Sequence, residues 1–341
     1  MKVLSFGEIL LRLSSPGYTR LFQKDSLDAT FCGGEANVAV SLSIFGVDSI
    51  FVTKLPNNDV GIAASNSLRY FGVDTSKIIY DEGRLGLYYL EKGASQRSSK
   101  VIYDRKNSSI AEAKLEDFDW EYIFEGVNWF HWTGINPALS DNLAEICLEA
   151  CKIAKQKGII VSCDLNYRKN LWSSQNAEKV MTQIMPYVDV CIANEEDADK
   201  VLGIKTKNND IEGAKLNKEG YVEVAKTICE RYGCKYVAIT LRESYSASKN
   251  GWAAMLYDFA KNESFFSRTY EIQIVDRVGG GDSFTAGIIY GLVSEMKNQD
   301  IIEFATAASC LKHTIEGDYN RTTIEEVEKL LISGGSGRVD R

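Results

Sequence analysis

One junction in the sequence constrains the fold more than any other. It is a glycine-rich turn between two apolar segments. Residues 270–275 (YEIQIV) alternate and contain β-branched side chains, which predicts a strand. Residues 283–293 are apolar with several small side chains, which predicts a buried helix. Between them lies Asp276-Arg-Val-Gly-Gly-Gly-Asp282. Glycines at such a junction allow a tight turn and let a ligand approach the backbone closely.

The helix after this turn is expected to form an anion hole. Its first backbone amides have no partner within the helix, and the helix dipole favours negative charge at this end. We therefore predict that Gly279, Gly280 and Gly281 bind a phosphoryl group, and that Asp282 is the general base that takes a proton from the attacking hydroxyl. The same residues, taken alone, are equally well explained as a glycine turn followed by an ordinary aspartate.

Composition and missing motifs exclude several classes of protein. The sequence contains neither Gly-x-x-x-x-Gly-Lys-Ser/Thr nor Gly-x-Gly-x-x-Gly after the first predicted strand, and the second absence argues against an NAD-dependent oxidoreductase. A net charge of −8 leaves no basic excess for nucleic acid. The sequence contains no apolar run of about 18 residues, the length that would predict a membrane span. The eight cysteines form no Cys-x-x-Cys pair, which indicates reduced thiols in a cytoplasmic protein.

The rest of the chain alternates predicted strands and helices, a pattern typical of a mostly parallel sheet with helices on both faces. Asp59 is expected to cap the second helix, and Gly33 and Gly34 open the first, with Asn37 on its first turn. The predicted strands cover residues 2–8, 49–54, 127–133, 159–164, 188–193, 236–241 and 253–258, and the later helices cover 59–71, 142–156, 219–232, 298–312 and 323–331.

Residues 83–105 have a different character. Two short aromatic and β-branched segments flank a polar turn, which predicts a β-hairpin. We expect this hairpin to form a small β-sheet lid outside the main core, built approximately from residues 11–31 and 84–108. Alternation along the second strand puts Tyr103 and Arg105 on the same face. Exposed apolar faces on such a sheet favour a homodimer through the lid.

Two motifs together resemble the signatures of the ribokinase-like (PfkB) carbohydrate kinases. The first is Gly33-Gly34-x-x-Asn37-x-Ala39, and the second is Asp276-x-x-Gly279-Gly280-Gly281-Asp282. They stand in the expected order, and the resemblance covers essentially the whole chain. It implies a single kinase domain over residues 1–341, a three-layer α/β/α fold with a mostly parallel central sheet and a small β lid. Arg277 departs from the family pattern, which usually has a small residue there.

Within the family the chain is most similar to 2-keto-3-deoxygluconate kinases. The similarity implies ATP-dependent phosphorylation of the primary hydroxyl of a sugar acid, with Asp282 as base and Mg²⁺ as cofactor. A requirement for a monovalent cation stays open. The residues expected to bind the sugar are Gly33, Gly34, Asn37, Tyr88, Tyr103, Arg105, Asn166, Arg168 and Asp282. Those expected at ATP are Asn194, Thr240, Arg242, Gly279 and Gly281, with Asn194 and Asp197 holding Mg²⁺ through water.

Several of these assignments have alternatives. Arg105 and Arg168 suit the sugar's carboxylate because a guanidinium matches two oxygens, but a solvated charge or a loop ion pair also explains them. Tyr88 and Tyr103 are equally well explained as packing within the hairpin. The alternative functions are a fructokinase, ribokinase or other neutral-sugar kinase of the same family, an NAD-dependent oxidoreductase, and a non-catalytic sugar-binding protein.

Overall fold

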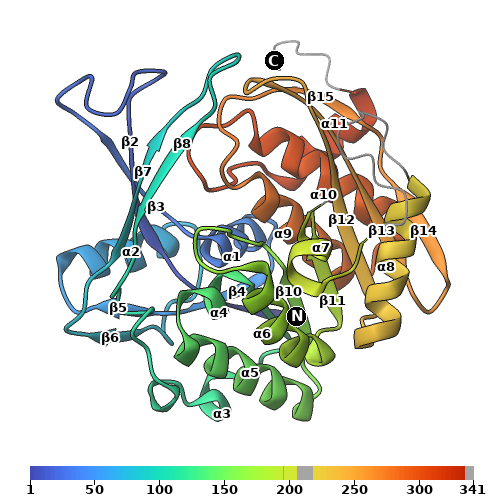
Figure 1. The fold of residues 1–341 in the computed structure, drawn as a ribbon, viewed down its shortest axis with the longest axis horizontal. Helices are drawn as coiled ribbons and strands as arrows, with labels where there is room; N and C mark the ends of the chain where they lie inside the picture. Colours follow the sequence, from blue (N-terminus) through green and yellow to red (C-terminus); the bar gives the residue numbers. More distant parts are fainter. Residues whose placement is uncertain (195, 206–217, 335–341) are drawn as a thin grey trace.

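The computed structural model describes residues 1–194, 196–205 and 218–334. Within these residues the main sheet has nine strands in the order β14-β13-β12-β11-β10-β9-β1-β4, with β15 paired to β13 (Figure 1). The strands from β12 to β4 are parallel, and β13, β14 and β15 add antiparallel pairs at one edge. This confirms the mostly parallel sheet. The strands are β1 (Lys2–Phe6), β4 (Asp48–Val52), β9 (Trp129–Thr133), β10 (Ile160–Asp164), β11 (Val190–Ala193), β12 (Tyr236–Ser244), β13 (Lys249–Asp258), β14 (Glu263–Phe266) and β15 (Tyr270–Gln273).

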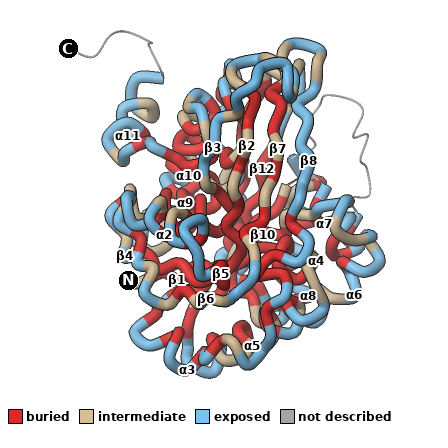
Figure 2. The backbone as a smooth tube through the Cα atoms, turned by 90° about the vertical axis from the view of Figure 1, so that its left-hand side faces the viewer, coloured by how far each residue is buried: buried red, intermediate tan, exposed pale blue. Residues whose placement is uncertain are grey.

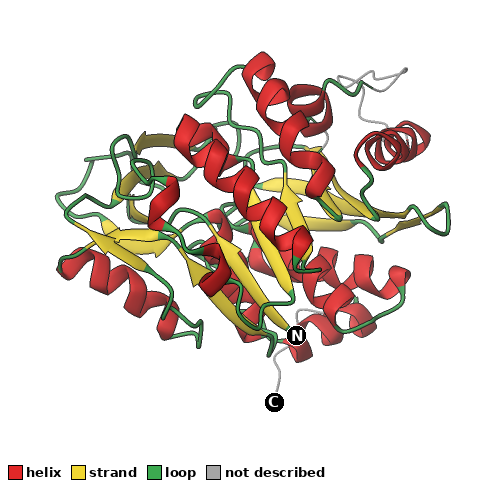
Figure 3. Cartoon of the chain, turned by 90° about the horizontal axis from the view of Figure 1, so that it is seen from below, coloured by secondary structure: helices red, strands yellow, loops and turns green. Residues whose placement is uncertain are grey.

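Helices cover both faces of the main sheet, because neighbouring residues of each strand point to opposite sides. In β1, for example, Leu4 and Phe6 belong to one apolar cluster and Val3 to the other. Figure 3 shows helices on either side of the strands, and Figure 2 shows the buried strands between them. The first cluster includes α3 (Trp120–Ile123), α5 (Asp141–Gln156), α6 (Ser174–Ile184), α7 (Asp197–Leu202) and α8 (Lys218–Tyr232); the second includes α1 (Gly34–Ile44), α9 (Gly280–Val293), α10 (Asn298–Lys312) and α11 (Ile324–Ser333).

A separate sheet projects beside the main one, at the upper left of Figure 1. Its strand order is β3-β2-β7-β8, and β7 and β8 form the predicted antiparallel hairpin. The strands are β2 (Leu10–Ser14), β3 (Asp28–Cys32), β7 (Gly86–Glu91) and β8 (Lys100–Asp104). We call this the small sheet. The remaining elements are β5 (Lys54–Pro56), β6 (Ile79–Asp81), α2 (Asp59–Arg69), α4 (Ile135–Leu139) and the 3₁₀ helices η1 (Leu115–Asp117) and η2 (Met185–Tyr187).

The structure corrects one local prediction and extends others. The predicted cap at Asp59 is wrong, because Asn58 has the extended backbone of a cap and its side-chain oxygen accepts hydrogen bonds from the amides of Val60 and Gly61. Helix α9 begins at Gly280, inside the glycine turn, and α6 was not predicted. All eight cysteines are free thiols, as expected. Within the described residues, no helix combines the length and apolarity needed to cross a membrane.

Candidate active site

The glycine turn between β15 and α9 is packed so tightly that two of its positions admit no side chain. Gly279 has φ +82, and a Cβ there would lie 2.0 Å from the carbonyl oxygen of Asp318. A Cβ at Gly280 would lie 2.2 Å from the imidazole of His313. Gly281 has open space instead, because nothing lies within 4 Å of its Cβ position. The turn is therefore packed from below by the Asp318 carbonyl and the His313 ring, and it is open above, where the first amides of α9 have no helical partner.

Asp282, in the first turn of α9, meets the first glycine motif across the molecule. The Nδ2 of Asn37 on α1 donates a hydrogen bond of 2.6 Å to its Oδ2, although 245 residues separate the two. Burial raises the pKa of Asp282 to about 6, while the hydrogen bond from Asn37 and the charge of Arg168 oppose this rise. A carboxylate with this pKa is ionised at neutral pH and can still accept a proton, as a general base must.

Two adjoining pockets share Asp282 as a lining residue. The first lies toward the small sheet and contains every residue predicted to bind the sugar, namely Gly33, Gly34, Asn37, Tyr88, Tyr103, Arg105, Asn166, Arg168 and Asp282. The second lies over the carboxyl ends of the strands and contains every residue predicted for ATP, namely Asn194, Thr240, Arg242, Gly279 and Gly281. The fold thus brings both predicted sets together around one carboxylate, as a two-substrate transfer needs, and Tyr88, Tyr103, Asn166 and Arg168 line both pockets.

The two arginines of the sugar-side pocket differ in their partners. Arg105 is buried, and its guanidinium forms an ion pair with the buried Glu8, donating from Nε over 2.8 Å. The face of Tyr103 lies 4.9 Å from the same guanidinium. Arg168 is exposed at the carboxyl end of β10, and it forms no ion pair with any residue that the structure describes. Arg168 is therefore the cation with capacity for a ligand carboxylate.

These features, two glycine motifs joined through one carboxylate, agree with the comparison with known proteins. A model of the pfkB family of carbohydrate kinases matches residues 1–324. The chain belongs to this family. The predicted ribokinase-like fold is thereby confirmed, and the protein is a sugar kinase.

Similar proteins cover the chain almost completely. It is 54% identical to 2-dehydro-3-deoxygluconokinase from Thermotoga maritima, whose crystal structure it matches with a TM-score of 0.92 over 97% of this chain and 99% of that one. It is 30% identical to 2-dehydro-3-deoxygalactonokinase from Haloferax volcanii, over 100% of this chain and 99% of that protein. A putative ribokinase II from E. coli, in complex with ATP and Mg²⁺, matches with a TM-score of 0.80 over 97% of this chain and 99% of that one. At 20% identity it shows the shared fold alone.

Asn194, just after β11, and Asp197, at the start of α7, have side-chain oxygens that already bind the backbone. The two carboxylate oxygens of Asp197 accept hydrogen bonds from the amides of Tyr167 (3.1 Å) and Asn194 (3.0 Å). Asn194 in turn accepts from the amides of Glu196 and Asp197. In the described part of the chain, no group of three or more His, Cys, Asp or Glu side chains is arranged to hold a metal ion. These residues suit a hydrated Mg²⁺, which keeps several of its waters, better than a bare ion.

Asp164 supports the fit of a cation at this end of the sheet. Its buried carboxyl has a pKa well above the usual range, because of burial and then repulsion from Asp197 and Asp282. Asn166, two residues on, has φ +41 and donates its backbone amide to Asp164. Asparagine tolerates this left-handed conformation better than most residues. A divalent cation held nearby through water would lower the mutual repulsion of these carboxylates.

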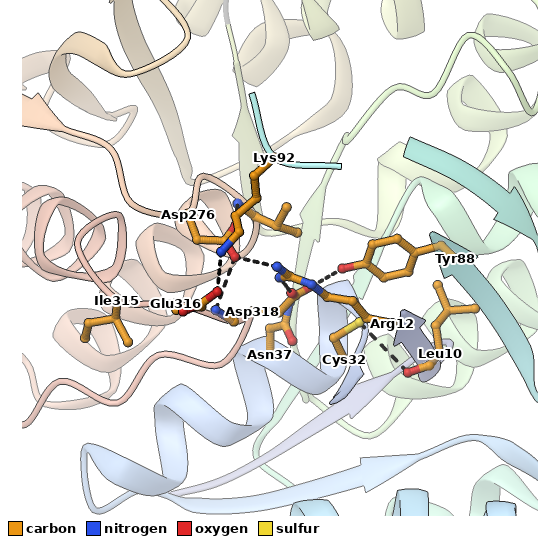
Figure 4. A network of polar contacts seen from close by, with 12 residues as sticks. Leu10, Arg12, Cys32, Asn37, Tyr88, Lys92, Asp276, Ile315, Glu316 and Asp318 are labelled. Atoms are coloured by element: carbon orange, nitrogen blue, oxygen red, sulfur yellow. Dashed lines mark hydrogen bonds and ion pairs between the residues drawn. The ribbon is translucent and has the colours of Figure 1, made fainter. Parts of the chain in front are cut away.

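Sequence reasoning missed a buried ion network beneath the site (Figure 4). Arg12 of β2 forms ion pairs with Asp276 and Asp318, and Tyr88 donates a hydrogen bond of 2.7 Å to Asp318. The network joins the small sheet to the glycine turn. An arginine inside the alternating segment 10–13 was a signal, since a charge in such a strand needs a partner. Nothing in the sequence indicated Asp318.

We expect kcat/KM for the sugar to fall as the pH drops through about 6. The pKa of Asp282 is raised to about 6, and only the ionised carboxylate is a base, so activity is present above this pH and lost below it. A pH–rate profile between pH 5 and 8 tests this. Glu35 needs a control, because burial raises its pKa to about 7. The Glu35→Gln variant should retain the acidic limb; its disappearance in that variant would assign the limb to Glu35.

Proposed function

We propose that this sugar kinase phosphorylates the primary hydroxyl of 2-keto-3-deoxygluconate with ATP and forms 2-keto-3-deoxy-6-phosphogluconate. The name of the 54% identical protein from Thermotoga maritima, in which 2-dehydro means 2-keto, supports this substrate. The observation that carries the proposal is Arg168, which lines the sugar-side pocket with Asp282 and has no ion-pair partner among the described residues. The carboxylate of a sugar acid would provide that partner in a bidentate pair. Arg105, held by Glu8, would present its remaining N–H groups to the same pocket.

Asp282 acts as the base in the proposed mechanism. Its carboxylate takes the proton of the primary hydroxyl while the hydroxyl oxygen bonds to the γ-phosphorus. The bond between that phosphorus and its bridging oxygen breaks, and ADP leaves with the electron pair. The amides at the start of α9 donate to the phosphoryl oxygens that carry the developing charge. Asn37 orients the base through its hydrogen bond of 2.6 Å.

The second pocket would receive the nucleotide, with Thr240, Arg242 and the glycine turn around its phosphates. Asn194 and Asp197 would hold Mg²⁺ through water. Mg²⁺ supplies neutralisation of phosphate charge during transfer. The small sheet would act as the lid that keeps water from the reacting groups. We assign the enzyme to the cytoplasm, where ATP is available and its thiols stay reduced.

The test of this function is a coupled ADP-release assay with ATP, Mg²⁺ and a panel of sugars. The panel contains 2-keto-3-deoxygluconate, 2-keto-3-deoxygalactonate, gluconate, fructose and ribose. Turnover on 2-keto-3-deoxygluconate well above the others supports the proposal. Preference for the galactonate epimer, which the relative from Haloferax volcanii accepts by name, would move the assignment to that sugar. Preference for fructose or ribose would overturn the sugar-acid assignment.

Arg168→Gln is expected to lower kcat/KM for the sugar acid by about 10- to 100-fold, the worth of a lost charged hydrogen bond of roughly 1.5–3 kcal/mol. Any slow turnover of fructose should not change, because fructose has no carboxylate. Arg84→Gln is the matched control, since Arg84 pairs with Asp104 at an exposed position of the small sheet. An equal loss on both sugars in Arg168→Gln would contradict carboxylate binding and indicate a role at the phosphates.

We also propose that the enzyme is a homodimer through the small sheet. The strand register sets Leu13, Tyr89 and Ile102 side by side, together with Ala29, on one face. The opposite face carries Tyr88 and Tyr103, which line the site. The centre of the outward face is therefore apolar, with Lys100 and Asp104 at its ends, and Ile102 is 44% exposed. A second copy covering this face would bury it from water.

Tyr89→Asp is expected to convert the dimer into a monomer, because a charge at the centre of an apolar interface has no partner there. Size-exclusion chromatography with light scattering measures the change. Tyr122→Asp is the matched control, since Tyr122 is 53% exposed on α3, far from the small sheet in Figure 1. A wild-type protein that is monomeric at micromolar concentration, or a Tyr89→Asp dimer, would contradict this interface.

A further inference from the structure

Lys312 is a buried cation directly beneath the glycine turn. It ends α10 and is 0% exposed. Its chain packs under the turn, since a Cβ at Gly279 would lie 3.1 Å from its Cε. Its ammonium group donates to two backbone carbonyl oxygens, of Asp276 at 3.5 Å and of Ile315 at 3.3 Å. Both residues are labelled in Figure 4. Among the residues that the structure describes, none forms an ion pair with Lys312.

This environment is unusual for a lysine. Burial of an ammonium without a bonded carboxylate is costly, and a methionine of similar shape would fill the space without that cost. Burial lowers the pKa of Lys312, and repulsion from Arg12 lowers it further. The negative charges of Asp276, Asp318 and Asp282 raise this pKa and offset only part of the decrease. Arg12 already pairs with Asp276 and Asp318, and Lys312 brings a second cation to this buried cluster. The coordination by main-chain carbonyls is that of a bound monovalent ion rather than of a salt bridge.

The two carbonyls belong to the segments that shape the anion hole. Asp276 begins the glycine turn, and Ile315 lies just before Gly317 and Asp318, whose backbone contacts the turn: the amide of Gly317 donates to the Asp276 carboxylate over 3.2 Å. The carbonyl of Asp318 lies against Gly279. A cation shared by Asp276 and Ile315 holds these segments together and adds positive potential below the amides of Gly280 and Gly281.

We propose that Lys312 is a positioning residue that serves as a built-in monovalent cation for the anion hole. It fixes the glycine turn from below, so the kinase needs no external potassium or ammonium ion. An alkylammonium group and a potassium ion carry the same charge, and backbone carbonyl oxygens can bind either of them. The proposal rests on the proposed phosphoryl transfer to a sugar, but it concerns only the nucleotide side of the site.

Four forms of the full-length enzyme test it with the chloride salts of tetramethylammonium, Na⁺, K⁺ and NH₄⁺ at equal ionic strength. Wild-type kcat should be the same in all four. Lys312→Ala opens space at the carbonyls, so its kcat should fall by about 10²-fold in tetramethylammonium, as for loss of one oxyanion-stabilising group, and recover in K⁺ or NH₄⁺. Lys312→Met fills the space with a neutral chain, so its kcat should fall equally and not recover. Lys92→Ala, which removes the nearby lysine paired with Glu316, should show no cation dependence.

Rescue by cations separates this role from a merely structural one, which added potassium would not restore. Strong activation of the wild type by K⁺, or full kcat in Lys312→Met, would overturn the proposal. If Lys312→Ala does not fold, the wild type and Lys312→Met still decide between these outcomes. Calorimetric binding of a non-hydrolysable ATP analogue with Mg²⁺, in the same salts, keeps the test independent of the sugar. A further outcome is that the enzyme turns over no sugar while the binding of the ATP analogue to Lys312→Ala still depends on the cation. That result would contradict the proposed substrate but would support the role of Lys312.

Discussion

Replacing Asp282 by asparagine is expected to lower kcat by about 10²- to 10⁴-fold, the usual contribution of a general base. The KM values for ATP and sugar should change little, because asparagine has the same shape and its oxygen can still accept the hydrogen bond from Asn37. The fold should be retained. Burial raises the pKa of Asp282, so the ionised carboxylate does not stabilise the folded state and its removal should not lower the melting temperature.

The coupled ADP-release assay at pH 7.5, far above the pKa of Asp282, gives the most direct measurement. Asp300→Asn is a closely matched control, because Asp300 is the third residue of α10 just as Asp282 is the third of α9, but it is exposed and outside both pockets. A variant of Asp282 that keeps most of its kcat would contradict the assignment of the base. A loss in KM alone would show that the carboxylate binds substrate without taking the proton.

Arg12→Met is expected to lower the free energy of unfolding by about 3–5 kcal/mol, the cost of leaving buried charges without their partner. Arg12 is 1% exposed, and its two partners, Asp276 and Asp318, are 2% and 3% exposed. Methionine fills the volume but leaves two carboxylates facing each other away from water. Tyr88 still donates to Asp318, which compensates only part of the loss. Urea denaturation followed by circular dichroism measures the difference.

Arg84→Met provides the comparison, because its ion pair with Asp104 is exposed and should contribute about 1 kcal/mol or less. Arg12→Met should also reduce kcat, since the network connects β2 of the small sheet to the start of the glycine turn. Equal stability of the two variants would mean that the buried network is solvated or unpaired in solution. Loss of stability with unchanged kcat would separate the network from catalysis.

The two glycine motifs could be recognised from the sequence because each occupies a short segment with fixed spacing. Asp282 follows the glycines at a fixed offset on the helix, although the atoms that exclude a side chain at Gly279 and Gly280 belong to Asp318 and His313. The alternation of strands and helices predicted the main sheet for the same reason, since the side-chain periods of 2 and 3.6 are properties of short segments. The pocket assignments followed from the rule that parallel strands end at one edge of a sheet.

Ion-pair partners that lie far apart in the chain could not be predicted from the sequence. Arg105 was expected as a ligand for the sugar, and the structure pairs its guanidinium with Glu8, which lies just after β1 and could not be identified as its partner from the sequence. The cap of α2 moved by one residue to Asn58, because backbone dihedrals and not residue type alone select between neighbouring caps.

The sequence by itself determined the family, the layered fold, the glycine turn and the candidate base, because each depends on a short stretch with a fixed backbone geometry. Only the tertiary structure decided which charges are available for ligands and which serve the fold. It buried Arg12 between two aspartates, left Arg168 open to the pocket and set Lys312 under the anion hole. The physical reason is that the state of a charge depends on its solvation and its nearest counter-charge, and both are set by segments that meet only when the chain folds.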